Sequence, residues 1–172
     1  MIAGADWGTT AQERAMALPC DRLMATAPVR LDRAVSIQAP RELVFRWLCQ
    51  LKHAPYSYDL LDNFGRTSPR ELTPGAERLA PGQRFMSIFA LACFAPDEQI
   101  TLRSLRTAVT YAAIADGAAT RLVARVLFDP PGGRLSAALT GRALALGDLL
   151  MMRKQLLTLK ALAERDAARA GA

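Results

Sequence analysis

The sequence has few of the residues from which catalytic and metal-binding sites are most often built. It contains one histidine, His53, and three cysteines, Cys20, Cys49 and Cys93, which lie far apart. The cysteines have neither the CxxC spacing nor the histidine partners of a zinc site, and their odd number does not fit a disulfide framework. We therefore expect buried, reduced thiols in a cytoplasmic protein, with no metal and no cofactor.

Long apolar runs and clusters of one charge are also missing. No segment approaches the ~18 uninterrupted apolar residues that indicate a transmembrane helix, and polar residues interrupt the N-terminal region where a secretory leader would be apolar. The formal net charge is +6, but the arginines are scattered among acidic residues. This distribution favours a mixed-charge surface and argues against nucleic-acid binding.

The remaining features indicate one globular domain preceded by an arm. With 172 residues, of which 51% are hydrophobic, the chain is most economically a single domain. Residues 1–28 are expected to form an irregular N-terminal arm, in which Thr10 and Glu13 have the spacing of a helix capping box. The single ligand-binding domain is expected over residues 29–168.

Hydrophobic periodicity predicts the order of the elements in that domain. Alternation over 31–38 predicts a strand, the segment "PRELVFRWLCQL" predicts a helix, and "YSYDLLDNFG" predicts a second short helix. After "DPPGG", a continuous apolar stripe predicts one long helix toward the C-terminus. Between them, closely spaced strand-like runs predict an antiparallel meander. These runs cover residues 84–94, 98–105, 108–115 and 120–128.

Several segments, in their order and spacing, resemble the SRPBCC superfamily, the START-like and polyketide-cyclase-like proteins, and especially a bacterial branch with an N-terminal arm. They are "WGTTAQE", "RAVSIQAPRELVFRWLCQL", "YSYDLLDNFG", "LAPGQRF", "ATRLVARV" and "GDLLMMRKQLLTLKALAE". The resemblance implies the helix-grip fold, with a hydrophobic cavity between the sheet and the C-terminal helix. It also implies relatives that bind lipids, sterols, polyketides or other apolar molecules, with some cyclases or dehydratases, and it supplies no shared catalytic motif.

We therefore predict an α+β helix-grip fold in which a curved antiparallel sheet wraps around a long C-terminal helix, with two short helices after the first strand. The predicted function is binding of a small apolar or amphipathic molecule, such as a lipid, in the cavity. One alternative is a cyclase or dehydratase that uses a tyrosine or aspartate as acid/base group. A second is a protein-interaction or regulatory module. An enzyme should have at least one ionisable group buried inside the cavity, and a carrier should have an almost wholly apolar interior. An interaction module should have a collapsed cavity and a large apolar outer patch.

The candidate ligand contacts come from "YSYDLLDNFG", the strands and the long helix. Asp148 and Gln155 flank the apolar stripe of that helix, where they either reach the ligand or pair with arginines at the wet edge. Tyr58, Asp59 and His53 are the candidate acid/base groups. Helix capping by the aspartate, packing by the tyrosine and a surface position for the lone histidine are the favoured explanations of these three. The predicted ligand-binding set is Tyr56, Tyr58, Asp59, Asn63, Phe89, Tyr111, Asp148, Met152 and Gln155.

Alternation also predicts which strand faces meet solvent. On the 120–128 strand, Arg121 and Arg125 share one face with Val123. The other face holds four apolar residues and is the better candidate to look inward, so both arginines are expected at the solvent surface. Residues 84–94 are apolar on both faces, which leaves the inward face open. We expect the outer face of this strand to be covered, either by the arm with Trp7 or by a second subunit in a homodimer.

Overall fold

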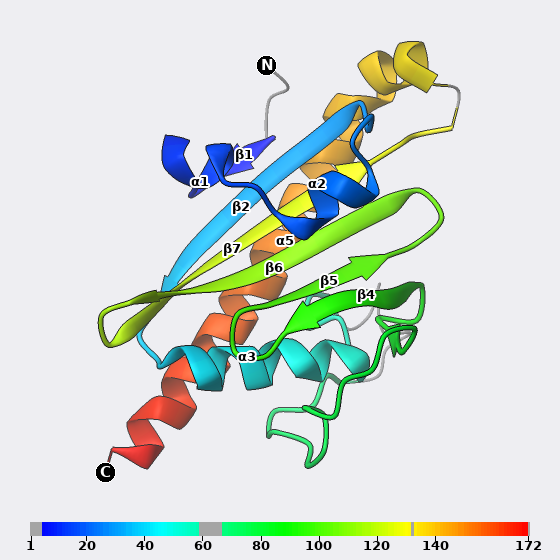
Figure 1. The fold of residues 1–172 in the computed structure, drawn as a ribbon. Helices are drawn as coiled ribbons and strands as arrows, with labels where there is room; N and C mark the ends of the chain where they lie inside the picture. The colour runs from blue at the N-terminus through cyan, green and yellow to red at the C-terminus, as the bar shows by residue number, and fades with distance from the viewer. Residues whose placement is uncertain (1–4, 59–66, 132, 172) are drawn as a thin grey trace.

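A computed structural model describes residues 5–58, 67–131 and 133–171 of the chain. The N-terminal segment contributes a short strand and two short helices (Figure 1). A long strand, two helical segments, a meander of five strands and one long C-terminal helix follow. The elements are β1 (Asp6–Trp7), α1 (Ala11–Ala15), α2 (Pro19–Leu23), β2 (Val29–Ile37), α3 (Arg41–Cys49), η1 (Gln50–Lys52), β3 (Arg84–Phe85), β4 (Phe89–Ala95), β5 (Gln99–Arg103), β6 (Thr107–Asp116), β7 (Ala119–Phe128) and α5 (Gly133–Ala170).

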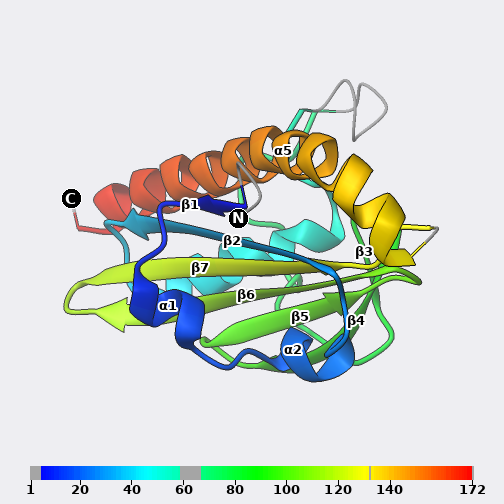
Figure 2. The same cartoon turned by 90° about the horizontal axis from the view of Figure 1, so that it is seen from above.

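The strands form one sheet with the order β1-β2-β7-β6-β5-β4-β3. The edge strand β1 runs parallel to β2, and the other neighbours are antiparallel. Helix α5 crosses one face of the sheet, while α1 and α2 lie on the opposite face (Figure 2). We call these the inner and the outer face. The predicted α+β helix-grip architecture is confirmed.

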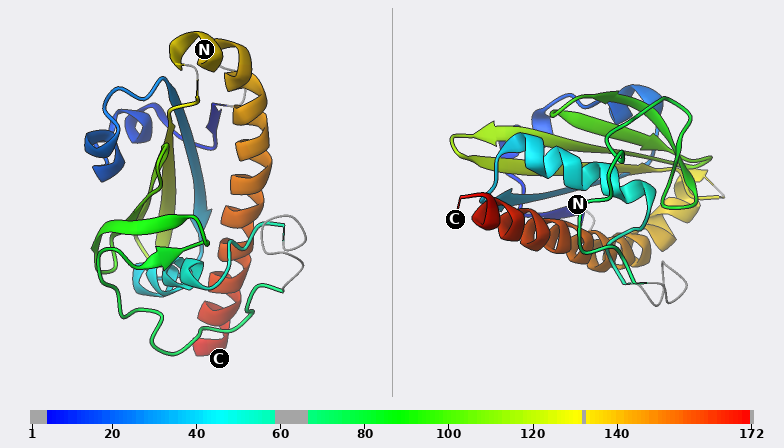
Figure 3. Two further views of the ribbon diagram at one scale, coloured as in Figure 1. Left: turned by 90° about the vertical axis from the view of Figure 1, so that its right-hand side faces the viewer. Right: turned by 90° about the horizontal axis from the view of Figure 1, so that it is seen from below.

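Helix α3 closes one end of the space between α5 and the sheet (Figure 3). Val44, Trp47 and Leu48 recur at helical spacing and are almost completely buried, which explains why this segment packs as an amphipathic helix. The indole Nε1 of Trp47 donates a hydrogen bond to Asp166 of α5 at 3.2 Å. The ring of Tyr56 packs edge-on against the indole, with centroids 6.0 Å apart. Together these contacts fix α3 and the following residues against the C-terminal half of α5.

The N-terminal arm is more ordered than expected. The capping box of Thr10 and Glu13 is present at the start of α1. Helix α2 packs on the outer face of β5, β6 and β7, and α1 lies on the same side of the sheet. Trp7 is not on the outer side of β4, where one alternative placed it. It lies in β1 at the other edge of the sheet, and the guanidinium carbon of Arg153 lies 5.5 Å from its ring centroid.

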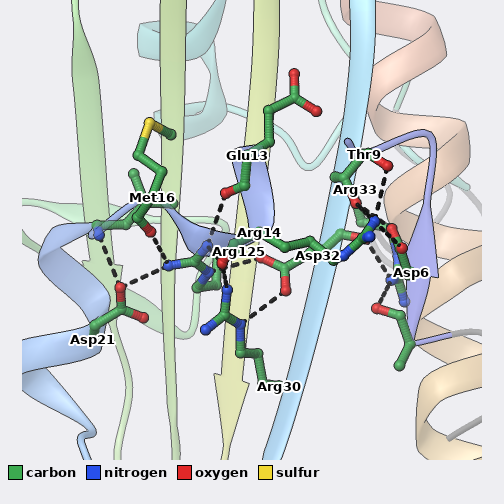
Figure 4. A network of polar contacts seen from close by, with 12 residues as sticks. Asp6, Thr9, Glu13, Arg14, Met16, Asp21, Arg30, Asp32, Arg33 and Arg125 are labelled. Carbon is green, nitrogen blue, oxygen red and sulfur yellow. Dashed lines mark hydrogen bonds and ion pairs between the residues drawn. The ribbon is translucent and has the colours of Figure 1, made fainter. Parts of the chain in front are cut away.

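The prediction that Arg125 faces solvent is wrong. Its side chain is on the outer face, as alternation requires, but the arm covers that position and Arg125 is fully buried. All five guanidinium N–H groups have acceptors in a network that joins β7, β2 and the arm (Figure 4). Nε donates to Asp32 (2.7 Å), Nη1 to Asp21 (2.6 Å) and the Met16 carbonyl (2.7 Å), and Nη2 to the Glu13 (3.1 Å) and Arg14 (3.0 Å) carbonyls.

Arg121 is likewise not a freely solvated side chain. Its guanidinium pairs with both carboxylate oxygens of Glu13, at 2.6 and 3.1 Å, and also bonds to the carbonyl of Gly8. The hydrogen bond from Arg121 lowers the pKa of Glu13, although partial burial opposes it. The two arginines of β7 therefore attach the arm to the sheet.

The single strand expected over 84–94 is divided in two. Met86 and Ser87 adopt left-handed backbone angles, with φ of 45° and 64°, and the chain turns back so that Phe85 pairs with Phe89. Left-handed angles are rare for residues other than glycine, asparagine and aspartate, so the sequence carries no turn signal at this point. The predicted second short helix within "YSYDLLDNFG" lies mostly outside the described residues.

Candidate functional site

A cavity of about 420 Å³ lies between α5 and the inner face of the sheet. Val109 and Tyr111 of β6 and Val126 of β7 line the sheet side. Asp148, Met151, Met152 and Gln155 line the helix side, and residues 86–89 of the β3–β4 turn form part of the rim. The volume falls within the range of pockets that bind small molecules.

The local sequence explains why these side chains converge. Residues 107, 109 and 111 alternate along β6 and so share its inner face, and Val109 pairs directly with Val126 on β7. Asp148, Met152 and Gln155 follow one another at spacings of four and three residues, which places them along one side of α5. Alternation along β6 therefore brings side chains to the sheet side of the cavity, and helical spacing along α5 brings side chains to the helix side.

A chain of hydrogen bonds crosses the cavity from sheet to loop. The Tyr111 hydroxyl donates to Gln155 Oε1 at 2.7 Å, and Gln155 Nε2 donates to the carbonyl of Pro55 at 2.6 Å. The Pro55 carbonyl can only accept, so it fixes the orientation of the Gln155 amide, and this in turn requires Tyr111 to donate. Burial raises the pKa of Tyr111, so this side chain stays a neutral hydroxyl.

The second polar group of the cavity is a buried ion pair. Arg33 of β2 is fully buried and donates from Nη2 to Asp148 Oδ2 at 3.0 Å. Arg33 Nη1 donates to the carbonyls of Ala5 and Asp32, at 2.6 and 3.0 Å, so the same guanidinium also contacts the chain just before β1. Burial raises the pKa of Asp148 to about 6, although the positive charge of Arg33 opposes this. Asp148 is thus an ionisable group at the cavity wall.

The structure places five of the predicted ligand contacts at the cavity. These are Phe89, Tyr111, Asp148, Met152 and Gln155. Asp148 pairs with Arg33 and not with Arg153, and Gln155 is only 3% exposed. The wet-edge alternative is therefore wrong for Gln155, whereas Asp148 does pair with an arginine, although that arginine is buried.

Three of the other predicted residues lie away from the cavity wall. Tyr56 is buried against Trp47, away from the cavity wall, while Tyr58 is 40% exposed. His53 is exposed at the end of η1. Asp59 and Asn63 lie outside the described residues. Of the candidate acid/base groups, neither Tyr58 nor His53 is among the residues that line the cavity.

The sequence interpretation missed Arg33. This residue shares a strand face with Leu31, Val35 and Ile37, which are all buried on the inner face of β2. A single arginine on an otherwise apolar strand face indicates either an error in the alternation or a buried charge with a partner. Arg33 is a buried charge with a partner, Asp148. The position of an arginine on this apolar face was the signal in the sequence.

Asp148 gives the stability a pH dependence whose sign follows from its pKa. The pKa is about 6 in the folded protein, against an ordinary value of 3.8, so between these values the folded state holds the proton and the unfolded state does not. The stabilisation from this group is present at low pH and is lost as the pH rises through about 6.

We therefore compare wild type with Asp148→Asn by urea unfolding. The unfolding free energy of wild type minus that of the variant should fall by on the order of 3 kcal/mol between about pH 3.5 and about pH 7. All other titrating groups are common to both proteins and cancel. A difference that rises, or that does not change with pH, would show that the Asp148 carboxyl is not buried as described.

Two further observations concern the described part of the chain. No group of three or more His, Cys, Asp or Glu side chains there is arranged to hold a metal ion. No described helix combines the length and the apolar character that crossing a membrane demands. A second hollow, of about 390 Å³, lies on the outer face between α2 and β4, where Leu18, Leu23 and Cys93 line it.

Comparison with known proteins identifies similar folds. No protein-family model and no curated protein matches the sequence. Among solved structures, TTHA0849 from Thermus thermophilus is 15% identical over 80% of this chain and 99% of its own, with a TM-score of 0.51. The Polyketide_cyc-like protein Cgl2372 from Corynebacterium glutamicum (14% identity, 83% and 95% coverage, TM-score 0.48) and the Aha1 dimer from Colwellia psychrerythraea (14%, 79% and 96%, 0.44) also match. The identities are low, so the likeness shows a shared fold and nothing about function.

Proposed function

We propose that the protein binds one small, largely apolar molecule in the cavity between α5 and the sheet. The observation that carries this proposal is the composition of the cavity wall. Most of its surface is apolar, and six side chains with polar groups also line it: Ser57, Ser87, Thr107, Tyr111, Asp148 and Gln155. A mostly apolar pocket with a few fixed polar groups is typical of small-molecule sites.

Exposed apolar side chains at the rim support the same proposal. Ile88 of the β3–β4 turn is 72% exposed and Met151 of α5 is 43% exposed, and both line the cavity. Exposing large apolar side chains to water gains nothing for the fold itself, whereas they would cover an apolar guest as it enters. Met151 and Met152 add unbranched thioether side chains that adapt to the shape of a ligand.

The proposal is tested by titrating the protein with N-phenyl-1-naphthylamine, a neutral apolar dye that fluoresces strongly once it leaves water. We expect saturable binding with one dye per chain. Fluorescence that increases linearly with dye, without saturation, would indicate non-specific partition and contradict a defined site. The dye requires no knowledge of the natural ligand.

An enzyme of the cyclase or dehydratase kind is the second candidate, and Asp148 favours it. A carboxyl group with a pKa of about 6 beside an apolar cavity exchanges protons near neutral pH. In this version Asp148 replaces Tyr58 and Asp59 as the acid/base group. Turnover would appear in mass spectrometry as a polyketide substrate converted to a product that has lost water. The interaction-module alternative required a collapsed cavity, which the volume of about 420 Å³ does not support.

A further inference from the structure

The polar groups of the cavity differ in what they can still offer to a ligand. The Tyr111 proton is committed to Gln155, and the Gln155 amide donates to the carbonyl of Pro55 and, at 3.4 Å, to the sulfur of Met86. The Tyr111 oxygen and Gln155 Oε1 each retain lone pairs. In these two side chains, the donors are therefore used up within the protein while acceptors remain.

Asp148 adds the strongest acceptor of the cavity. Among the described residues, Arg33 is its only hydrogen-bond donor, and that contact occupies Oδ2. The Asp148 side chain lines the cavity and is 21% exposed. After burial, the negative charge of Asp148 is the next cause that raises the pKa of Tyr111. The carboxylate and the phenol are therefore close enough to interact electrostatically. A carboxylate oxygen can accept a further hydrogen bond.

Resting on the binding function proposed above, we propose that the ligand is an apolar alcohol or phenol whose hydroxyl donates a hydrogen bond to Asp148, with Tyr111 and Gln155 as neighbouring acceptors. A carboxylate head would meet the negative charge of Asp148 and find acceptors where it needs donors. An ammonium head would add a second positive charge beside Arg33, against one carboxylate. Ser57, Ser87 and Thr107 also line the cavity, but their hydroxyls both donate and accept and so do not discriminate between heads.

The test compares three molecules of similar length by their ability to displace N-phenyl-1-naphthylamine. Decanol has a donating hydroxyl, and nonyl methyl ether has the same number of heavy atoms and an oxygen that can only accept. Decanoate has a charged, accepting head. We expect decanol to displace the dye at about tenfold lower concentration than the ether, because it alone donates to a charged acceptor. Decanoate should be the weakest of the three.

Asp148→Asn provides a sharper test of the acceptor. Arg33 has only donors, so it holds the amide oxygen of the new side chain and turns the amide nitrogen toward the cavity. The strongest acceptor thereby becomes a donor. We expect the preference for decanol over the ether to fall to about threefold or less, and decanoate to bind better than it does to wild type. The control is Asp129→Asn, whose carboxylate is half exposed outside the cavity and pairs with Arg106.

The outcomes separate this inference from the proposed function. If the dye does not bind wild type saturably, the binding function itself is wrong. If the dye binds but the ether or decanoate displaces it as well as decanol does, the binding function stands and the preference for a donating head is wrong. The wild-type series decides this point even if Asp148→Asn does not fold.

Discussion

Replacing Arg125 with methionine is expected to destabilise the protein by about 3–5 kcal/mol, the range for removing one partner from a buried ion pair. Methionine fills much of the volume but removes all five donors. Oδ1 of the buried Asp32 and the Met16 carbonyl then lose the donor that the structure gives them. The Glu13 and Arg14 carbonyls lose one donor each and keep a second, from Met16 N and from the Arg30 guanidinium. The measurement is urea unfolding at neutral pH, followed by circular dichroism and analysed as a two-state transition.

Arg106→Met is the matched control for this prediction. Arg106 is 47% exposed and its nearest carboxylate contact, to Asp129, is 3.9 Å, so its loss should change the stability by no more than about 0.5 kcal/mol. Arg125→Lys should fall between the two, because an ammonium has three donors and cannot reach five acceptors at once. Equal stabilities for Arg125→Met and Arg106→Met would mean that the arm does not cover Arg125 in solution.

Replacing Val126 with phenylalanine is expected to weaken dye binding at least about tenfold while leaving the stability unchanged or raised by up to about 2 kcal/mol. Val126 lies on the inner face of β7, paired with Val109, and lines the cavity. The larger ring occupies space that the guest needs and buries additional apolar surface in the cavity. The dye titration and urea unfolding are carried out on the same preparation.

Val126→Ala separates filling of the cavity from any other effect at this position. Removing two methyl groups enlarges the cavity and should cost about 1–2 kcal/mol of stability, while dye binding is retained. The two variants thus have opposite signatures, one losing affinity and the other losing stability. If Val126→Phe binds the dye as wild type does, the dye occupies another site.

The larger features of the fold could be predicted because they depend on local patterns. The apolar stripe after residue 133 predicted α5, and alternation predicted β6 and β7 within one or two residues of their observed ends. Alternation also assigned Arg125 to the correct face of its strand. It could not predict the burial of Arg125, because that depends on an arm more than 100 residues away in the sequence.

The candidate site was predictable in part for the same reason. Helical spacing placed Asp148, Met152 and Gln155 near one side of α5, but their partners come from other elements. The hydrogen bond between Tyr111 and Gln155 joins residues 44 apart in the sequence, and the β3–β4 turn at Met86 and Ser87 depends on backbone angles that the residue types do not indicate. Side-chain periodicity predicts which residues share one face of a helix or strand. The geometry of a cavity depends on which faces of different elements pack together, and periodicity within one element does not predict this.

The most direct test of the cavity as a binding site is a crystal structure of the protein grown with decanol brominated at the end of its chain. We predict one strong anomalous bromine peak between α5 and the inner face of the sheet, with the hydroxyl within hydrogen-bond distance of Asp148. A bromine peak confined to the hollow between α2 and β4, or a cavity that remains free of ligand at saturating concentration, would contradict the account.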